Sequence, residues 1–180
     1  MAASSSPMLS AVLILIISAG AGTGAAETAL DQVCGRLGGN YVTPELCKSA
    51  LCTDQSACRA ARDAPAVAAL AARLAADNAT AARASIEAYA RSPPPSPAEA
   101  EAVRSCLQLY AGAAPALQWA ARSVAAGRYR AATEVLQAAR YVSGGCNGMA
   151  GDQVKLPREN EGFSYMAFVA HAVVASMSRN

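Results

Sequence analysis

The stretch VRSCLQLYAGAAPALQWAARSVAAGRYRAATEVLQAARYVSGGC, residues 103–146, contains two helical patterns that meet at Gly127. On both sides of this glycine, apolar residues recur at three- and four-residue steps, which is the spacing of one buried helix face. Because Gly127 breaks the pattern, we expect the two helices to fold back on each other as an antiparallel hairpin. The expected inward positions are Val103, Cys106, Tyr110, Ala113, Leu117, Ala120 and Val124 before the glycine, and Ala132, Val135, Ala139 and Val142 after it.

Two features of this hairpin predict local irregularities. Pro115 lies within the first helix, where the missing N–H of proline predicts a kink. The sequence SGGCNG at residues 143–148 is expected to end the second helix, because glycine adopts the left-handed backbone that helix ends require.

The hairpin also brings two cysteines to the same height. Cys106 lies 21 residues before Gly127, and Cys146 lies 19 residues after it. At a rise of about 1.5 Å per residue, the two cysteines sit within about 3 Å of the same level. We therefore predict a Cys106–Cys146 disulfide at the open end of the hairpin, which should stabilise the fold by about 3–4 kcal/mol on chain-entropy grounds.

Two further helices are expected around this hairpin. Residues 63–91 and the residues after Pro157 both show helical spacing in an alanine-rich composition. The sequence SPPPSP at residues 92–97 ends the earlier helix, and Ser96, Pro97 and Glu99 are typical of a capped helix start. The sequence therefore predicts an all-α protein, an up-down-up-down four-helix bundle. The apolar faces are Val67, Leu70, Leu74, Ile86 and Tyr89 in the earlier helix, and Phe163, Met166, Ala170, Val173 and Met177 in the last.

The N-terminus predicts export from the cell. Residues 1–26 contain no charged side chain, and an apolar run at residues 8–17 is followed by small residues, which is the layout of a cleaved signal peptide. A retained anchor is the alternative. Export would place the six cysteines in an oxidising compartment, where disulfides are expected. A zinc site at Cys47, Cys52 and Cys58 is a second possibility, but it requires a fourth ligand and a reducing compartment.

A short helical hairpin is expected directly after the signal. The Gly-Gly-Asn sequence at residues 38–40 predicts a break, and Thr43-Pro44 predicts a helix start. Cys34 and Cys47 then face each other across the mouth of the hairpin. Because so small a hairpin buries little surface, it needs a covalent link, and we predict a Cys34–Cys47 disulfide.

Cys52 and Cys58 remain, and they are close enough in the sequence to close a small loop, so we predict a Cys52–Cys58 disulfide as the third pair. The expected organisation is a removed signal at residues 1–26 and one domain at residues 27–180. Within that domain, residues 27–60 form the disulfide-linked hairpin, and residues 61–180 form the four-helix bundle.

The composition argues against several classes of protein. The net charge is +2, and the basic residues are mostly single arginines among alanines, which does not predict nucleic-acid binding. The longest uncharged stretches after the signal, residues 105–121 and 162–178, contain polar residues and fall short of a membrane span. We expect them to be buried helices and the exported chain to bind no membrane. We expect a monomer without a cofactor or a metal site.

The sequence resembles the plant family of invertase inhibitors and pectin methylesterase inhibitors. The resemblance covers the whole exported chain and lies in VCGRLGGNYVTPELCKSAL, VRSCLQLYAGAAPALQWA, AAGRYRAATEVLQAA with the following GGC, and ENEGFSYMAFVAHAVV. The cysteine arrangement is its specific part. In the family, two disulfides correspond to Cys34–Cys47 and Cys106–Cys146. Cys52 and Cys58 depart from the basic four-cysteine pattern, so the resemblance implies nothing about their pairing.

The resemblance also implies a function. Family members are not enzymes; they form reversible complexes with secreted cell-wall enzymes or vacuolar enzymes and block access of the substrate. Invertase inhibitors often carry Pro-Lys-Phe at the bend between the second and third bundle helices, whereas this bend has Gly127, Arg128, Tyr129 and Arg130. The sequence therefore favours pectin methylesterase as the partner, with acid invertase as the alternative. It predicts a protein of the cell wall and apoplast, with the vacuole as another location.

The bend is the expected partner-binding site. Tyr129 stands between Arg128 and Arg130, and tyrosine and arginine are residue types that anchor protein interfaces. The alternative is that Tyr129 packs back against the helix start while both arginines are solvated. Asn78 begins the sequence Asn-Ala-Thr, which is an N-glycosylation signal in an exported chain. Glycan attachment requires that face of the predicted helix to point outward.

No residues predict catalysis. His171 is the only histidine, and no nucleophile motif accompanies it, so we expect it at the core edge or the surface. Trp119 is expected to anchor packing. A disulfide-linked carrier of apolar ligands is a further alternative function. The alanine-rich seams argue against a carrier, because small side chains let helices close together.

Overall fold

The computed structural model describes residues 27–37, 42–92, 96–151 and 154–178. Three expected features lie outside these residues: the signal at residues 1–26, the break at residues 38–40, and the prolines at residues 93–95. Within the described residues all regular structure is helical, so the predicted all-α class is confirmed.

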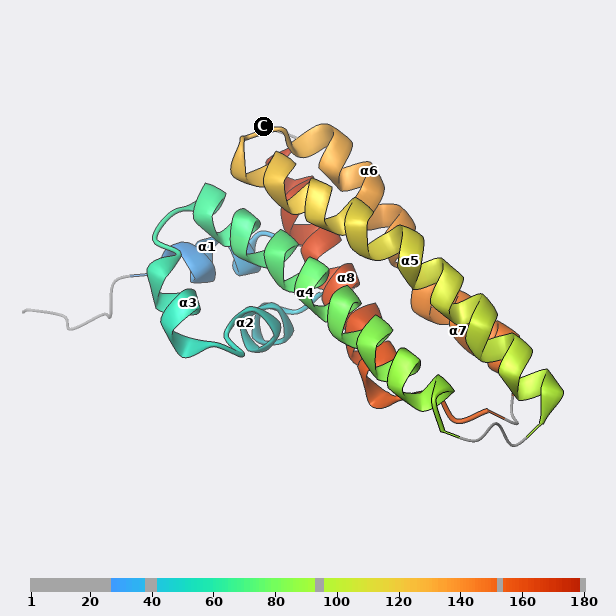
Figure 1. Ribbon diagram of the computed structural model, residues 1–180. Helices are drawn as coiled ribbons and strands as arrows, with labels where there is room; N and C mark the ends of the chain where they lie inside the picture. The colour runs from blue at the N-terminus through green and yellow to red at the C-terminus, as the bar shows by residue number, and fades with distance from the viewer. Residues whose placement is uncertain (1–26, 38–41, 93–95, 152–153, 179–180) are drawn as a thin grey trace, which may run out of the picture.

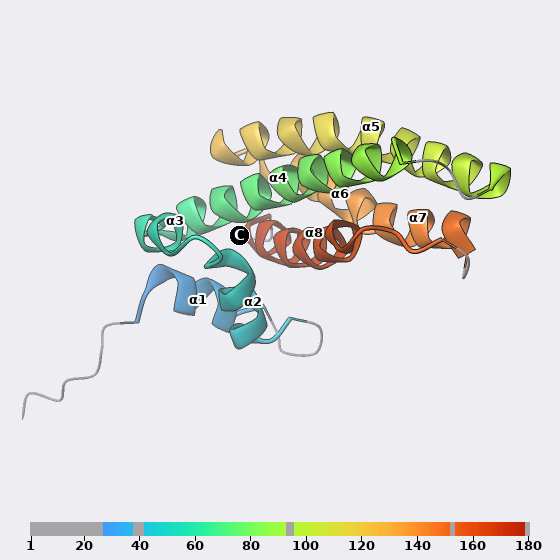
Figure 2. The same ribbon diagram turned by 60° about the horizontal axis from the view of Figure 1, so that its bottom comes forward.

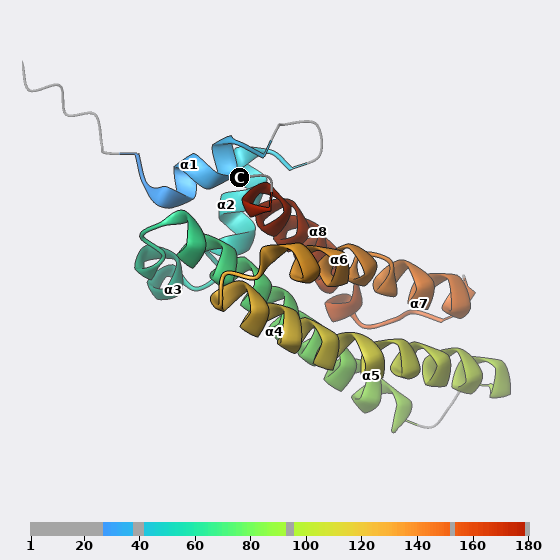
Figure 3. The same ribbon diagram turned by 90° about the horizontal axis from the view of Figure 1, so that it is seen from above.

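Four antiparallel segments form the bundle, in the predicted up-down-up-down order (Figure 1). They are α4 (Ala64–Ala90), α5 (Pro97–Ala125), the pair α6 (Tyr129–Ala139) and α7 (Val142–Ala150), and α8 (Arg158–Met177). The helix α4 packs against α5 and α8, and α6 packs against the same two helices from the other side. Figure 3 shows α4 and α5 running side by side along most of their length.

Side-chain caps start the two longest helices. The Asp63 carboxylate accepts a hydrogen bond from the Ala66 N–H at 2.8 Å, and the Ser96 hydroxyl accepts one from the Glu99 N–H at 3.2 Å. Both bonds satisfy backbone donors that have no partner within the helix, and each cap contributes about 1 kcal/mol. Proline follows shortly after each cap, and the sequence predicts it at Pro97.

Alanine fills much of the space between the helices. On α4 the buried face is mostly alanine, so neighbouring helices approach closely and leave little room for an apolar ligand between them. Larger side chains close the core toward α5 and α8, where the rings of Tyr110 and Phe163 meet edge to face with centroids 5.3 Å apart. The buried alanines of α4 are Ala68, Ala71, Ala72, Ala75, Ala76, Ala79 and Ala82.

The third segment differs from the sequence prediction in two ways. It is broken at Arg140 and Tyr141 into α6 and α7, and α7 continues through residues 143–148, where we expected a helix end. Gly145 allows α7 to lie close to α5: a Cβ atom on this residue would stand 3.1 Å from the Leu109 Cδ1 atom. The helix ends instead at Gly151, whose φ of 60° is left-handed.

Most of the residues predicted to face inward are buried, with differences on the inward faces of α6 and α7. Leu136 is the fully buried apolar residue in the middle of α6, whereas Val135 and Val142 are partly buried at the edge of the core. Helix α5 continues on both sides of Pro115, and the expected kink there stays a prediction.

All three expected cysteine pairs are disulfides in the structure. The Cα–Cα distances are 5.6 Å for Cys34–Cys47, 5.0 Å for Cys52–Cys58 and 4.9 Å for Cys106–Cys146. The zinc alternative is therefore wrong, because Cys47, Cys52 and Cys58 are all bonded to sulfur.

The disulfide-linked N-terminal segment lies against the bundle beside α4 and α8 (Figure 2). It contains α1 (Ala29–Gly35), α2 (Pro44–Leu51) and α3 (Gln55–Ala60). The Tyr165 hydroxyl on α8 donates a hydrogen bond to the Leu46 carbonyl at 3.2 Å, which fixes α2 against the bundle. Lys48 and Asp31 join α2 to α1 through an ion pair of 2.9 Å.

Asp31 makes the α1–α2 hairpin sensitive to acid. Its pKa is lowered from 3.8 to about 2, first by the hydrogen bond from the Thr28 hydroxyl and then by that from the Lys48 ammonium. Because the folded pKa is depressed, the stabilisation is present above pH 3.8 and is lost as the pH falls toward 2. We expect Thr28→Val and Lys48→Met each to raise this pKa, because each removes a side-chain hydrogen bond to the carboxylate. An NMR titration of the Asp31 carboxyl carbon measures both shifts, and an unchanged pKa in either variant would contradict the assignment.

Candidate functional site

The bend between α5 and α6 is held by its own backbone. Gly127 has a φ of 74°, and its N–H donates to the Val124 carbonyl at 2.9 Å. The Arg128 N–H donates to the Ser123 carbonyl at 2.8 Å. This is the Schellman arrangement of a helix end, in which glycine takes the left-handed position. The bend is therefore fixed before any partner binds.

The C-terminal end of α8 supports the first turn of α6. The Thr133 hydroxyl bonds to the Tyr129 carbonyl at 2.9 Å and lies 3.0 Å from the Ser178 hydroxyl. Two elements that are 45 residues apart in sequence thus hold the bend in place.

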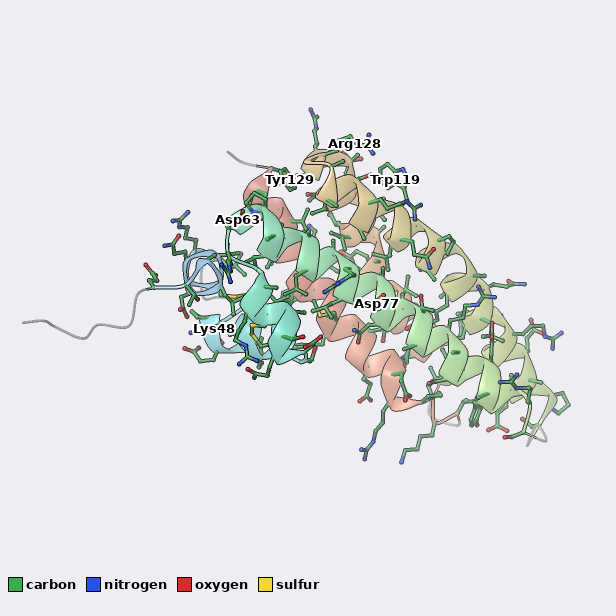
Figure 4. The ribbon with its side chains drawn as sticks, turned by 60° about the vertical axis from the view of Figure 1, so that its left-hand side comes forward. Lys48, Asp63, Asp77, Trp119, Arg128 and Tyr129 are labelled. Carbon is green, nitrogen blue, oxygen red and sulfur yellow. A yellow bond between two sulfur atoms is a disulfide. The ribbon has the colours of Figure 1, made fainter. Side chains whose placement is uncertain are left out.

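The three expected contact residues do not share one environment. Arg128 and Arg130 are exposed, whereas Tyr129 is half-buried and packs against the core. Tyr129 therefore packs partly against the core, as the alternative expectation has it, and Tyr129→Ala should lower stability as well as any binding. In Figure 4, Arg128 lies at the tip of the bend, with Tyr129 and Trp119 on different sides of it.

The bend lies in a segment without negative charge. Residues 102–133 contain four arginines and no aspartate or glutamate. Arg104 pairs with Glu101 at 3.1 Å, far along α5 from the bend. Among the described residues, no ion pair involves Arg122, Arg128 or Arg130. The bend therefore presents three exposed arginines that form no ion pair, and the acidic residue that follows them in the chain is the exposed Glu134 on α6.

Trp119 lies at the surface, although we expected it to be packed inside the protein. It is 42% exposed, so the expectation that it anchors packing is wrong. The helical spacing contains the signal that would have located it. Leu117 and Ala120 are buried, and a residue two positions after Leu117 on an α-helix lies on nearly the opposite face.

His171 lies at the core edge, as expected. It lines a groove of about 450 Å³ with Leu37, Val42, Arg140 and Phe168. Burial first and the Arg140 guanidinium second lower the pKa of His171, so its imidazole is neutral at pH 7. The described residues that line this groove include no hydroxyl, thiol or carboxylate with which His171 could form a catalytic pair.

The Asn78 sequon lies in the middle of α4. The Asn78 side-chain amide is half-buried and donates to the Leu74 carbonyl at 2.8 Å, and the Thr80 hydroxyl donates to the Ala76 carbonyl at 2.9 Å. Both polar side chains are therefore bonded to the backbone of their own helix. Glycan attachment at Asn78 stays a prediction.

The described residues contain neither a candidate metal site nor a candidate membrane span. In that part of the chain, no group of three or more His, Cys, Asp or Glu side chains lies close enough to hold a metal ion. None of the helices described is both long enough and apolar enough to cross a membrane.

Residues 28–173 match the family of plant invertase/pectin methylesterase inhibitors. The chain belongs to this family. Its members are inhibitors rather than enzymes and are extracellular in plants. The match covers every described disulfide and the bend between α5 and α6. No curated protein and no solved structure was found to be similar to the chain at a significant level.

Proposed function

We propose that the protein is a secreted inhibitor of pectin methylesterase that binds reversibly across the substrate cleft. The observation that carries this proposal is the preformed bend of α5 and α6, which presents Arg128 and Arg130 to solvent with no acidic residue between positions 102 and 133. The protein itself performs no catalysis. The invertase is the second candidate target, because the family includes inhibitors of both enzymes.

Electrostatics favour this docking mode. Pectin methylesterases and invertases both work with carboxylates in an open cleft, and arginine forms strong charge-assisted hydrogen bonds with carboxylates. A bend that is already rigid loses little conformational entropy when it binds, so more of the interaction energy remains as affinity. The absence of Pro-Lys-Phe at residues 127–130 favours pectin methylesterase over invertase.

The three disulfides support the proposed location. Disulfides persist in oxidising compartments, which include the cell wall and the secretory pathway. We infer that residues 1–26 direct export and are removed, and that the exported protein acts in the apoplast or the vacuole.

The double variant Arg128→Ala/Arg130→Ala tests this proposal. We expect it to raise the inhibition constant for the target by about 5- to 30-fold, because two charged contacts at the end of the bend are lost. The melting temperature should not change, since both side chains are exposed. The measurement is inhibition of plant pectin methylesterases and acid invertases, with the target identified first from the wild-type protein.

Arg158→Ala is the matched control. Arg158 is also exposed, but it begins α8 at the end of the bundle away from the bend, so its loss should leave inhibition unchanged. Equal inhibition by the wild type and the double variant would show that the bend does not contact the enzyme.

A further inference from the structure

The solvent face of α5 carries an uncharged strip. Its members lie on one side of the helix, are all exposed, and are defined here as the α5 strip: Gln108, Gly112, Pro115 and Trp119. Solvent faces of amphipathic helices normally carry charged residues. On the neighbouring helix α4, the exposed face includes Arg73, Asp77 and Arg83. The strip thus differs from the charged solvent face of α4.

The strip has the shape of a binding surface. Gly112 has no side chain and that of Pro115 is compact, so the strip offers little bulk beside the exposed indole of Trp119, which lies at the end nearest the bend (Figure 4). Tryptophan is enriched among the residues that dominate binding energy, because its large rigid surface is desolvated at little entropic cost. A 42% exposed tryptophan is not required by the core.

The charges around the strip indicate what kind of partner fits. One turn beyond Trp119 lies Arg122, and Arg128 and Arg130 follow past the bend, all exposed. An apolar centre with a positive border at one end is complementary to a cleft with a negative border. A second copy of this chain fits poorly, because residues 102–133, which carry the strip and its border, contain no acidic side chain that could pair with the arginines of the other copy.

We propose that Trp119 is the aromatic anchor of the contact with the target enzyme, inserted into the acidic substrate cleft while Arg122 and the bend pair with carboxylates at its border. This proposal rests on the inhibitory function proposed above. It assigns to Trp119 the role that the sequence predicted for Tyr129, which is half-buried against the core. The docked surface therefore extends along α5 from the bend.

Truncation of the indole tests the proposal. Trp119→Ala should raise the inhibition constant by about 30-fold or more, the size expected for an interface hot spot, without lowering the melting temperature. Trp119→Phe should recover part of the loss. Tyr141→Ala is the matched control, because Tyr141 is 69% exposed but lies at the break between α6 and α7 rather than on the α5 strip.

The chain contains a single tryptophan, so it also allows a direct measurement. With 5-fluorotryptophan incorporated, one ¹⁹F resonance reports on position 119. Adding the unlabelled target enzyme should shift this resonance, because the indole moves from water into the interface. A shift that instead depends on inhibitor concentration without enzyme would indicate self-association and overturn the proposed occupant.

The outcomes separate this proposal from the one it rests on. If Arg128→Ala/Arg130→Ala loses inhibition while Trp119→Ala keeps it and the ¹⁹F resonance does not shift, Trp119 is not the anchor and the inhibitory function stands. If the wild-type protein inhibits neither enzyme class, the proposed function fails, and the role of Trp119 fails with it.

Discussion

Replacing Cys106 and Cys146 with alanine is expected to lower the free energy of unfolding by about 4 kcal/mol. This disulfide closes a loop of 40 residues, the longest of the three. Without this disulfide the two ends of the loop move independently in the unfolded chain, which raises the conformational entropy of the unfolded state. Alanine is the suitable replacement, because both sites are fully buried and a serine hydroxyl would need a hydrogen-bond partner there.

Denaturant unfolding of the oxidised variant measures the effect as a lower midpoint. The matched control is Cys52→Ala/Cys58→Ala, which opens a loop of only 6 residues. The chain-entropy argument gives about 2 kcal/mol for that loop. Equal losses from the two pairs would show that loop length does not determine the stabilisation, and that local packing around the sulfur atoms does.

The bundle could be predicted because its signals are local. Asp63 and Ser96 cap helices within three residues of their own positions, and the burial of Leu117 and Val124 follows from spacing along one helix. Pairing of Cys106 with Cys146 needed only one additional assumption, a chain reversal at Gly127. Information of this kind does not depend on which other helix is nearby.

The glycines of α7 could not be interpreted in the same way. Glycine ends helices, but it also permits close contact between helices, and the choice depends on what lies opposite. Here Leu109 lies against Gly145, so this glycine permits a close approach to α5. That neighbour is far away in the sequence, which is why the local rule failed.

The sequence places the candidate contact residues at the bend, but it does not show how far each of them is buried. The sequence shows Tyr129 between two arginines, and it does not show that the end of α8 covers the first turn of α6 through Thr133 and Ser178. Trp119 was taken for a core residue because large aromatic side chains are usually buried. Its position relative to Leu117 on the helix predicts a surface residue. For Trp119, helical geometry is therefore the correct signal and hydrophobicity is not.

A buried polar network was also missed. The Tyr110 hydroxyl on α5 donates to the Asn160 side-chain oxygen Oδ1 at 2.8 Å, and the Asn160 side-chain nitrogen Nδ2 donates to the Asn147 side-chain oxygen at 2.8 Å. Asn160 is fully buried although it stands in the charged sequence RENEG at the start of α8. The network joins α5, α7 and α8, so it fixes how these helices align along their axes.

Asn160→Leu should therefore lower the free energy of unfolding by about 3 kcal/mol, because it leaves the buried Tyr110 hydroxyl without a partner. Tyr110→Phe should lower the free energy of unfolding by about 1.5 kcal/mol, because the Asn160 side-chain oxygen then loses its hydrogen-bond donor. The double variant should cost less than the sum of the two, since no donor is then left unpaired at that contact. Additive losses would mean that the two side chains do not depend on each other.

The ionisation of Tyr110 offers an independent check of the same network. Burial raises the pKa of the Tyr110 phenol well above its usual range. The folded pKa then exceeds the unfolded value of about 10, so the stabilisation is complete below that pH and is lost as the pH rises past it. The stability advantage of the wild type over Tyr110→Phe should therefore shrink as the pH is raised above about 10. A constant difference would mean that the phenol reaches water in the folded protein.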